Sequence, residues 1–307
     1  MLPMLPFKLI YHPQYDLDLG PHVFPSKKFK MIHDSLLAEG IAEDSDFAQP
    51  EPAPDEDVLR VHTAAYVQKL KTDSLTLSER MKLEIPVSDA TVKGFWLAAG
   101  GSTLAGRNAL RDGFSANLTG GFHHACAGHG EGFCMLHDVA IAIRSLQFAG
   151  AIRTAMVVDT DVHQGNGTAA IFADDPSVFT LSIHQENNYP MPKLPSDEDI
   201  GLDDGARDPE YLDALEKGLL RALKKMTPNI IFYVGGADPY REDQLGGLAL
   251  TIEGLQKRDR LVFEQARRLK IPVASTLAGG YARRVEDTVR IHVNTIISAH
   301  DVALRPK

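Results

Sequence analysis

Apolar residues along this chain follow two spacings, one typical of buried strands and one typical of amphipathic helices. Short apolar runs predict strands at 7–11, 155–158, 178–183, 230–234 and 273–277, and a further short strand begins at 117–118. Recurrence of apolar residues every three or four positions predicts helices at 28–39, 63–70, 95–111, 139–148, 168–172, 209–225, 251–269 and 285–299. From residue 117 onward the two kinds of segment alternate.

This alternation predicts βαβ units, whose strands run parallel in one continuous sheet. Residues 49–57 are rich in proline and acidic side chains, but a helical pattern resumes at Thr63, so we interpret them as an exposed loop within one domain. No internal repeat interrupts the pattern. We therefore predict a single domain over residues 1–307, with an α/β fold in which helices form layers on both faces of a mainly parallel central sheet.

Two carboxylates and an imidazole follow the predicted strand at 155–158, namely Asp159, Asp161 and His163. Side chains two positions apart in extended backbone point to the same side, so Asp161 and His163 can converge on one point. Ligands bind at this end of the strands in open α/β sheets. A capped loop with a packed histidine is the alternative, but three such residues within five positions favour the start of a catalytic zinc site.

Three further loops that follow predicted strands carry polar or glycine-rich motifs, at 120–124, 236–238 and 279–281, and all should lie at the same edge of the sheet. Asp238 would be the third metal ligand, although by itself it would be interpreted as a helix cap before Pro239. Three protein ligands leave one position open for water, as in catalytic zinc sites. Glycines in these loops allow the backbone to approach a substrate closely.

Groups suited to proton transfer lie in the same loops. His123 and His124 are adjacent, and histidine is the side chain whose ordinary pKa lies closest to neutrality, although both could simply be polar loop residues. Asp159 could orient an imidazole by accepting its N–H. Tyr281 could donate a hydrogen bond to a developing oxyanion. Together these residues predict hydrolytic chemistry beside the metal.

Composition narrows the class of protein further. The chain has 307 residues, of which 44% are hydrophobic and 24% charged, and its formal net charge of -9 argues against direct nucleic-acid binding. Its two cysteines, Cys126 and Cys134, are too few for a disulfide scaffold and fit a reducing compartment. Neither a secretory leader nor a long apolar span is recognisable, so we expect a cytoplasmic protein. Gly100-Gly101 does not follow a strand, which argues against a dinucleotide site there.

The constellation as a whole resembles the zinc-dependent histone deacetylase superfamily, whose fold is shared with arginase. The resemblance covers nearly the whole chain and rests on motifs in a fixed order: residues 61–63 with Tyr66, 120–125, 131–134, 159–167, 236–238 and 279–281. Residues 11–13 with 22–25, and 182–186, look most like the class IV branch and its bacterial relatives. The fold is therefore expected to be arginase/deacetylase-like.

The resemblance implies a role for each matching residue. Asp161, His163 and Asp238 would bind zinc, and His124 would be the main general base beside His123. Tyr281 would polarise the substrate carbonyl. Substrate-binding positions would be Gly132, Phe133, Gly279 and Gly280. A structural potassium ion would be held by Asp159, Asp161, His163, Ser182 and Ile183.

Two departures from the family pattern affect these expectations. Asn166 stands where class I members carry an aspartate beside the second histidine, and a neutral partner stabilises an imidazolium less, which bears on the pKa of His124. His137 replaces the usual asparagine and is interpreted as a packing residue. The acidic residue that grips a peptide backbone in the family has no clear counterpart here.

The expected activity is hydrolysis of the amide of N-ε-acyl-lysine on a protein or peptide, with a preference for long fatty acyl chains suggested by the class IV resemblance. Alternatives are a deacetylase of small amides such as acetylpolyamines, a two-manganese ureohydrolase, and a non-catalytic acyl-lysine binding module. The manganese enzyme would need extra bridging carboxylates, and Asp238 is instead followed by Pro239 and Tyr240. The oligomeric state is not indicated by the sequence.

Overall fold

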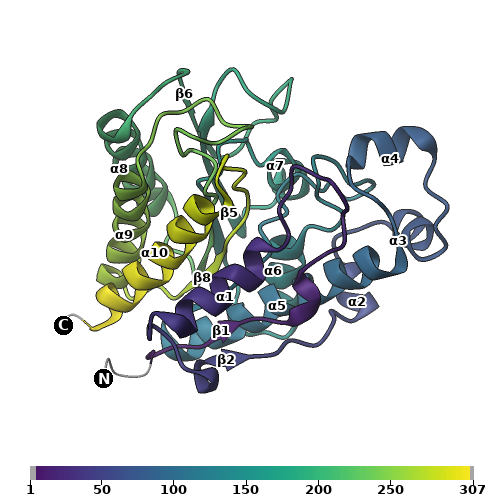
Figure 1. The fold of residues 1–307 in the computed structure, drawn as a ribbon, viewed down its shortest axis with the longest axis horizontal. Coiled ribbons are helices and arrows are strands. Elements are labelled where there is room, and N and C mark those ends of the chain that lie inside the picture. The colour runs from purple at the N-terminus through teal and green to yellow at the C-terminus, as the bar shows by residue number, and fades with distance from the viewer. Residues whose placement is uncertain (1–4, 305–307) are drawn as a thin grey trace.

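A computed structural model describes residues 5–304 and shows a parallel sheet between two layers of helices (Figure 1). The sheet order in this region is β2-β1-β3-β8-β7-β4-β5-β6, and every neighbouring pair is parallel. The strands are β1 (Leu9–Ile10), β2 (Phe47–Ala48), β3 (Phe114–Asn117), β4 (Ala155–Asp159), β5 (Val178–Gln185), β6 (Glu198–Leu202), β7 (Ile230–Val234) and β8 (Val273–Thr276). The predicted fold class is confirmed.

The helices are α1 (Lys28–Ala38), α2 (Asp55–Val58), α3 (Ala64–Lys71), α4 (Leu77–Leu83), α5 (Asp89–Asp112), α6 (Asp138–Phe148), α7 (Asn166–Phe172), α8 (Asp208–Lys225), α9 (Ile252–Arg268) and α10 (Val285–Leu304). Helices α1, α10, α9 and α8 pack side by side in one layer, and α5 packs against α6 in the other (Figure 1). The small α3–α4 region projects to one side. The predicted single domain, residues 1–307, extends beyond the described residues at both ends. The N-terminal segment in which we expected no secretory leader also begins outside the described residues.

Strands β4 and β7 form the centre of the molecule. Every residue of both strands is buried, and nearly all are apolar, because helices cover both faces of a parallel sheet. Burying each valine, leucine or isoleucine of this core contributes about 1.5–3 kcal/mol to folding. At the end of β4, Asp159 pairs in register with Ser182 on one side and Val234 on the other, which places a carboxylate at the edge of the buried sheet.

Local signals explain where several helices begin. The side chains of Thr63, Thr76, Ser88 and Thr251 each accept a hydrogen bond from the backbone of the first turn that follows. Helix α5 therefore begins at Asp89, six residues before the predicted start, and ends at Asp112, followed by Gly113 as a cap in the left-handed conformation.

Some predicted elements were displaced or missed. The strand expected to begin at 117–118 instead ends at Asn117, and α2 lies partly within the predicted loop 49–57. Strands β2 and β6 and helices α2 and α4 were not predicted, because they are short and half-exposed. Strand β6 is a sheet edge that mixes charged and apolar residues, so it lacks an apolar run.

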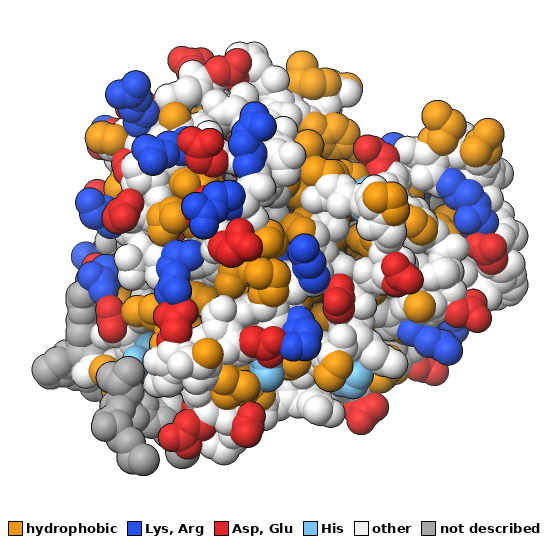
Figure 2. Space-filling model, viewed as in Figure 1, with side chains coloured by type: hydrophobic (Ala, Val, Ile, Leu, Met, Phe, Trp, Pro, Cys, Tyr) orange, Lys and Arg blue, Asp and Glu red, His pale blue; other side chains and the backbone are white. Residues whose placement is uncertain are grey.

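Charged side chains are mixed on the face shown in Figure 2. Lysine and arginine alternate with aspartate and glutamate over α8, α9 and α10, so this face carries no continuous basic patch. Within residues 5–304, no helix combines the length and the apolar character needed to cross a membrane.

Candidate active site

Four neighbouring strands bring the predicted site residues together. Strands β3, β8, β7 and β4 are adjacent in the sheet and parallel, so the loops that follow them leave from the same edge. These loops carry the paired histidines, the Gly279–Tyr281 segment, Asp238 and the Asp159–His163 segment. Residues more than 150 positions apart in the chain are therefore neighbours in space.

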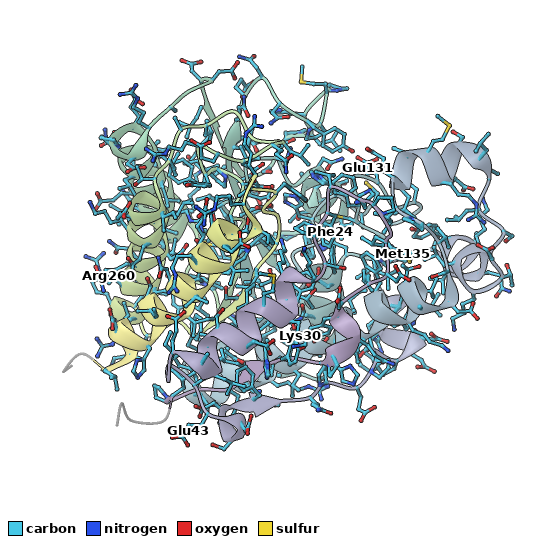
Figure 3. All side chains as sticks on the ribbon, viewed as in Figure 1. Phe24, Lys30, Glu43, Glu131, Met135 and Arg260 are labelled. Atoms are coloured by element: carbon cyan, nitrogen blue, oxygen red, sulfur yellow. The ribbon has the colours of Figure 1, made fainter. Side chains whose placement is uncertain are left out.

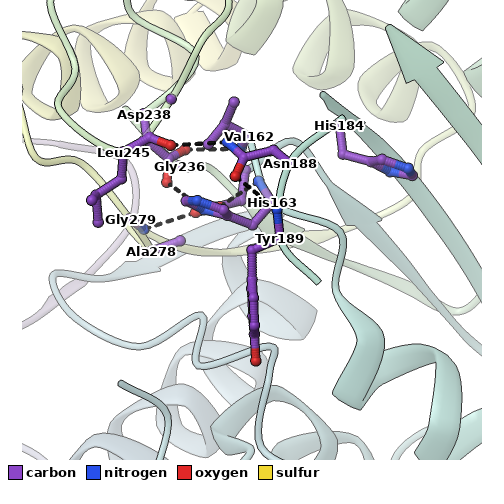
Figure 4. Close-up of polar contacts among 12 residues, drawn as sticks. Val162, His163, His184, Asn188, Tyr189, Gly236, Asp238, Leu245, Ala278 and Gly279 are labelled. Carbon is purple, nitrogen blue, oxygen red and sulfur yellow. Dashed lines mark hydrogen bonds and ion pairs between the residues drawn. The ribbon is translucent and has the colours of Figure 1, made fainter. Parts of the chain in front are cut away.

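The three predicted metal ligands converge. Candidate ligand atoms of Asp161, His163 and Asp238 all lie within 4.8 Å of one another. Nδ1 of His163 is 3.1 Å from Oδ1 of Asp161 and 3.4 Å from Oδ2 of Asp238 (Figure 4). Oδ2 of Asp238 is buried and accepts no hydrogen bond from the described residues. A buried carboxylate oxygen without a donor, facing an imidazole and a second carboxylate, fits a divalent cation, and this O, O, N donor set suits zinc.

Electrostatics of the three ligands also fit a cation. Burial and the charge of Asp161 raise the pKa of Asp238 to about 7. Burial alone lowers the pKa of His163, but its hydrogen bond to Asp161 and the negative charges of Asp161 and Asp238 outweigh burial and raise this pKa to about 10. Negative charge is thus concentrated where the three side chains meet.

Two glycines make room for this cluster. A Cβ atom on Gly279 would lie 2.1 Å from Oδ2 of Asp238 and 2.5 Å from Oδ2 of Asp161. A Cβ atom on Gly236 would lie 2.5 Å from Oδ2 of Asp161. The amide of Gly279 also donates a hydrogen bond to Asp161 Oδ2 at 3.0 Å. Any side chain at these positions would push the carboxylates apart.

The paired histidines lie beside the ligands and have different partners. Nδ1 of His123 donates to Oδ2 of Asp159 at 2.6 Å, the contact expected from the sequence. Nδ1 of His124 lies 2.7 Å from Oδ1 of Asn166. The two imidazole centroids are 4.1 Å apart, and Nε2 of His123 is 3.7 Å from Oδ1 of Asp161.

These partners push the two imidazole pKa values apart. Burial lowers the pKa of His123, but the charges of Asp159 and Asp161 outweigh it and raise this pKa to about 9. Burial and the neighbouring imidazoles of His123 and His163 hold the pKa of His124 well below its ordinary value. Pairs of titratable groups separated in this way are typical of an acid and a base acting together.

A buried aspartate that the sequence did not single out shapes the histidine loop. Asp138, the first residue of α6, accepts hydrogen bonds from the amides of Gly121 and Phe122 at 3.1 and 2.8 Å. Gly120 and Gly121 have φ angles of +84° and +75°, a left-handed conformation that favours glycine. The loop thus turns sharply just before His123.

Aromatic side chains close over the site. Tyr281 lies against Phe133 and Phe24, with ring centroids 5.9 and 6.2 Å apart, and all three line a cavity that also contains Gly132, Gly279, His124 and Asp161. Its volume is about 20 Å³. Phe133 has a φ of +67°, an uncommon conformation for an aromatic residue and one that is found mostly where the surrounding structure imposes it. Gly280 is buried next to Tyr281 and has a φ of +139°.

Several residues near the site were missed by the sequence analysis. Lys28 on α1 is fully buried, and its ammonium donates to the carbonyl of Ala278 at 2.7 Å. Tyr189 packs its ring against His124, with centroids 4.9 Å apart, and donates its hydroxyl to Glu131 at 2.9 Å. A lysine in a helical pattern is normally expected at the surface, and an isolated tyrosine carries no spacing signal. Glu131 did appear in a motif, but its contacts depend on tertiary structure.

His137 is a packing residue, as interpreted from the sequence. It is fully buried, its Nδ1 accepts from the Ala140 amide at the start of α6, and its Nε2 lies 2.9 Å from the hydroxyl of Thr168. Its backbone amide donates to His62 at 3.0 Å.

The residues expected around potassium, mainly through backbone oxygens, lie at the end of β4, in the loop after it and on β5. Ser182 is the register partner of Asp159, and Ser182 and Ile183 are both buried. The Ser182 hydroxyl is 2.9 Å from Nδ1 of His184. The site therefore stays a prediction.

Among residues 5–304, one other group of potential ligands converges, formed by Cys126, His129 and Glu131. The ammonium of Lys82 lies 2.6 Å from Glu131 and 2.7 Å from His129, so the chain already supplies a cation there. This group is separate from the Asp161 cluster and contributes no carboxylate to it. The Asp-x-Asp pattern expected of a two-manganese centre is absent after β7, because Pro239 and Tyr240 follow Asp238.

A parallel sheet with Asp, His and Asp converging at its carboxyl edge, beside paired imidazoles, is typical of a metal-assisted hydrolase. A family model described as Histone deacetylase domain matches residues 22–296. The chain belongs to the histone deacetylase family, and it is a hydrolase of that family with the arginase/deacetylase fold.

Similar proteins extend over nearly the whole chain. An uncharacterized protein from Picosynechococcus sp. is 40% identical over 298 residues, covering 96% of this chain and 99% of its own. Histone deacetylase 2 from Arabidopsis thaliana is 29% identical, covering 94% of this chain and 79% of its own. The crystal structure of an HDAC homolog complexed with SAHA has a TM-score of 0.81 and 26% identity, with coverage of 98% and 84%.

Proposed function

We propose that this protein hydrolyses the amide bond of N-ε-acyl-lysine, with one zinc ion held by Asp161, His163 and Asp238. The observation that carries the proposal is the convergence of these ligands beside a small cavity lined by aromatic side chains, next to two imidazoles whose pKa values are shifted in opposite directions. An acylated lysine side chain is a thin aliphatic stem with the scissile amide at its end, and it is narrow enough to enter between these aromatic rings once they separate.

The chain's own residues supply the proton transfers. Asp161, His163 and Asp238 would hold the zinc ion, which would supply a Lewis acid for the amide carbonyl and would lower the pKa of the attacking water toward about 7. His124, neutral at pH 7, takes a proton from the attacking water. The Tyr281 hydroxyl donates a hydrogen bond to the carbonyl oxygen as negative charge develops there, and an imidazolium of the pair protonates the leaving lysine amine. The products are a free amine and a carboxylate.

The cavity favours a short acyl group over the long fatty chains that the class IV resemblance suggested. Its volume of about 20 Å³ holds roughly one water molecule, so any acyl-lysine requires Phe24 or its neighbours to move, and a short acyl group requires the smaller movement. We therefore propose an acetyl group as the preferred substituent.

The surroundings of the cavity have room for the rest of the substrate. A groove of about 880 Å³ lies beside Tyr281, between the loop 16–27 and residues 282–286. It has space for a peptide or protein segment next to the modified lysine, which favours such a substrate over a small acylated amine. We extend the proposal to a structural potassium ion near Ser182 and to a cytoplasmic enzyme, supported by two unpaired cysteines.

The direct test is a series of peptides that carry acetyl-, butyryl-, octanoyl- or myristoyl-lysine, together with an acetylpolyamine, assayed with zinc-loaded protein. We expect kcat/KM to be highest for acetyl-lysine and to fall with chain length. Tyr281→Phe should lower kcat by about 100- to 1000-fold, because one oxyanion donor contributes ~2.7–4 kcal/mol.

Different results would separate the parts of the proposal. Highest efficiency on myristoyl-lysine would contradict the short-chain preference, and highest efficiency on the polyamine would contradict the lysine substrate. Absence of turnover on every substrate, with zinc bound, would support the binding-module alternative.

A further inference from the structure

Glu131 is a buried carboxylate that the chemistry described so far does not use. It is 4% exposed and lies where α4 faces the body of the molecule (Figure 3). Its Oε1 accepts hydrogen bonds from Asn166 Nδ2 at 2.5 Å and from the Tyr189 hydroxyl at 2.9 Å. Its Oε2 contacts Lys82 at 2.6 Å and His129 at 2.8 Å. One oxygen thus faces the active site and the other faces two partly exposed cationic or polar groups.

The contacts of Glu131 determine how Asn166 is oriented. A carboxylate can only accept hydrogen bonds, so the amide NH₂ of Asn166 must face Glu131 and its oxygen must face His124. An amide oxygen can also only accept, so Nδ1 of His124 must carry a proton. In the neutral imidazole this leaves the lone pair on Nε2, at the opposite edge of the ring. His124 is then ready to act as a base.

A second contact of Glu131 fixes the same imidazole from another side. The Tyr189 hydroxyl that donates to Oε1 belongs to the ring that packs edge-on against His124, with centroids 4.9 Å apart. One carboxylate oxygen therefore holds both the amide that orients His124 and the phenol ring that packs on it.

We propose that Glu131 is a positioning residue for proton transfer, which acts through Asn166 to hold His124 in the tautomer that can accept a proton at Nε2. This inference rests on the proposed function, in which His124 is the general base. This role of Glu131 explains how the neutral Asn166 can stand beside His124. The negative charge is carried by Glu131, which is one hydrogen bond further from the imidazole.

Glu131 has the charge that this role needs. Burial opposes its ionisation, but hydrogen bonds from Lys82, Asn166, His129 and Tyr189 outweigh burial and lower the pKa of Glu131 to about 2. The carboxylate is therefore ionised throughout the pH range in which the enzyme would work.

Exchange of the amide and the carboxylate provides a direct test. In Glu131→Gln, two amides would meet at this contact and each can donate or accept, so Asn166 is free to turn its NH₂ toward His124. In Asn166→Asp, two carboxylates would face each other across 2.5 Å. We expect kcat of each single variant to fall by about 10- to 100-fold, with KM for an acetyl-lysine peptide changed less than about threefold. The double variant E131Q/N166D restores one carboxylate and one amide, and should recover most of the lost kcat.

A matched control and a spectroscopic measurement accompany the kinetics. Glu198→Gln removes a carboxylate that also pairs with cationic side chains, Arg221 and Lys225, but lies on edge strand β6, and it should leave kcat unchanged. Zinc content and Tm show whether each variant is folded. In ¹⁵N NMR spectra of the zinc-loaded protein, wild-type His124 should show a protonated Nδ1 and an unprotonated Nε2, and Glu131→Gln should show a mixture of tautomers.

Two results would overturn the proposal. One is a folded, zinc-loaded Glu131→Gln protein with wild-type kcat and an unchanged His124 tautomer. The other is an E131Q/N166D protein no more active than the weaker single variant. If the wild type fails to hydrolyse acyl-lysine, the proposed function fails, but the NMR comparison still decides the role of Glu131.

Discussion

At the scale of single residues, the site depends on two glycines, Gly236 and Gly279, as much as on the three predicted metal ligands. Asp161 and Asp238 can approach each other only because Gly236 and Gly279 leave space beside their carboxylates. A Cβ atom at Gly279 would come closer to both carboxylates than any van der Waals contact permits. Metal binding should therefore be more sensitive to this glycine than to many charged residues nearby.

Gly279→Ala should weaken zinc binding by at least the 10- to 100-fold that is typical of changes next to metal ligands, because the added methyl group displaces Asp238 or Asp161. Competition with a chelator of known affinity measures the change. Gly128→Ala is the matched control, since nothing lies within 4 Å of the added atom. Equal zinc affinity in both variants would show that the crowding at Gly279 does not constrain the ligands.

The residues of the site differ in how far the sequence could reveal them. Asp161, His163 and Asp238 could be singled out because each follows an apolar strand, and parallel strands end at one edge. Glu131 matters through Asn166, a contact across 35 positions that no local pattern encodes. Lys28 could not be found, because an ammonium buried among aromatic rings contradicts the usual preference of lysine for the surface.

At the scale of elements, helix α9 supports the two loops that carry the metal ligands. Arg258 is fully buried, and its guanidinium donates to the carbonyls of Gly236 at 2.5 Å and Thr160 at 3.3 Å. These carbonyls belong to the loops after β7 and β4. Arg258 also lies 2.7 Å from Asp259, whose carboxylate accepts from Tyr233 and Thr295. One buried cation thus joins a helix to both sides of the ligand cluster.

Arg258→Met should lower the free energy of unfolding by about 3–5 kcal/mol, because it leaves the Asp259 carboxylate buried without its cation. Urea denaturation of the metal-free protein measures this loss. The double variant R258M/D259N removes both charges and should recover part of the stability. A single variant as stable as the wild type would show that the pair is not important for holding α9 to the sheet.

The sequence pattern predicts buried elements better than short or exposed ones. Strands β4, β5, β7 and β8 were predicted within a few residues, because each is buried on both faces and forms a continuous apolar run. Strand β2 has two residues and β6 lies at the sheet edge, so neither has such a run. The order β3-β8-β7-β4 could not be deduced from the chain either, since it depends on how helices cross over the sheet.

At the scale of the whole molecule, burial of the Lys28 ammonium next to the site lowers the free energy of unfolding. Burial lowers the pKa of Lys28 from its ordinary value of 10.5 to about 8, even though Asp238, Asp161 and Asp243 act in the opposite direction. Between pH 8 and 10.5 the unfolded chain therefore binds more protons at this position than the folded chain. The sign of this linkage means that Lys28 makes stability rise with pH across that window, and that the gain is lost again as pH falls from 10.5 to 8.

The size of this effect is on the order of 3 kcal/mol, since a difference of one in pKa corresponds to about 1.4 kcal/mol. Lys28→Met removes this titratable group, so the variant does not bury an ammonium at low pH. Its free energy of unfolding should exceed that of the wild type at pH 8, and the difference should shrink by about this amount between pH 8 and 10.5. Urea denaturation of metal-free protein at several pH values measures it, with the exposed neighbour Lys27→Met as control. The same pH dependence in both variants would contradict the assignment to Lys28.

The central claim is that Asp161, His163 and Asp238 hold a single catalytic ion beside His124 and Tyr281. Titration of metal-free protein with zinc, followed by acetyl-lysine turnover, tests it most directly. We expect activity to rise in proportion to added zinc and to level off at one equivalent per chain, while Asp238→Asn neither binds zinc tightly nor gains activity. Full turnover in the metal-free protein, or a requirement for a second equivalent, would contradict the claim.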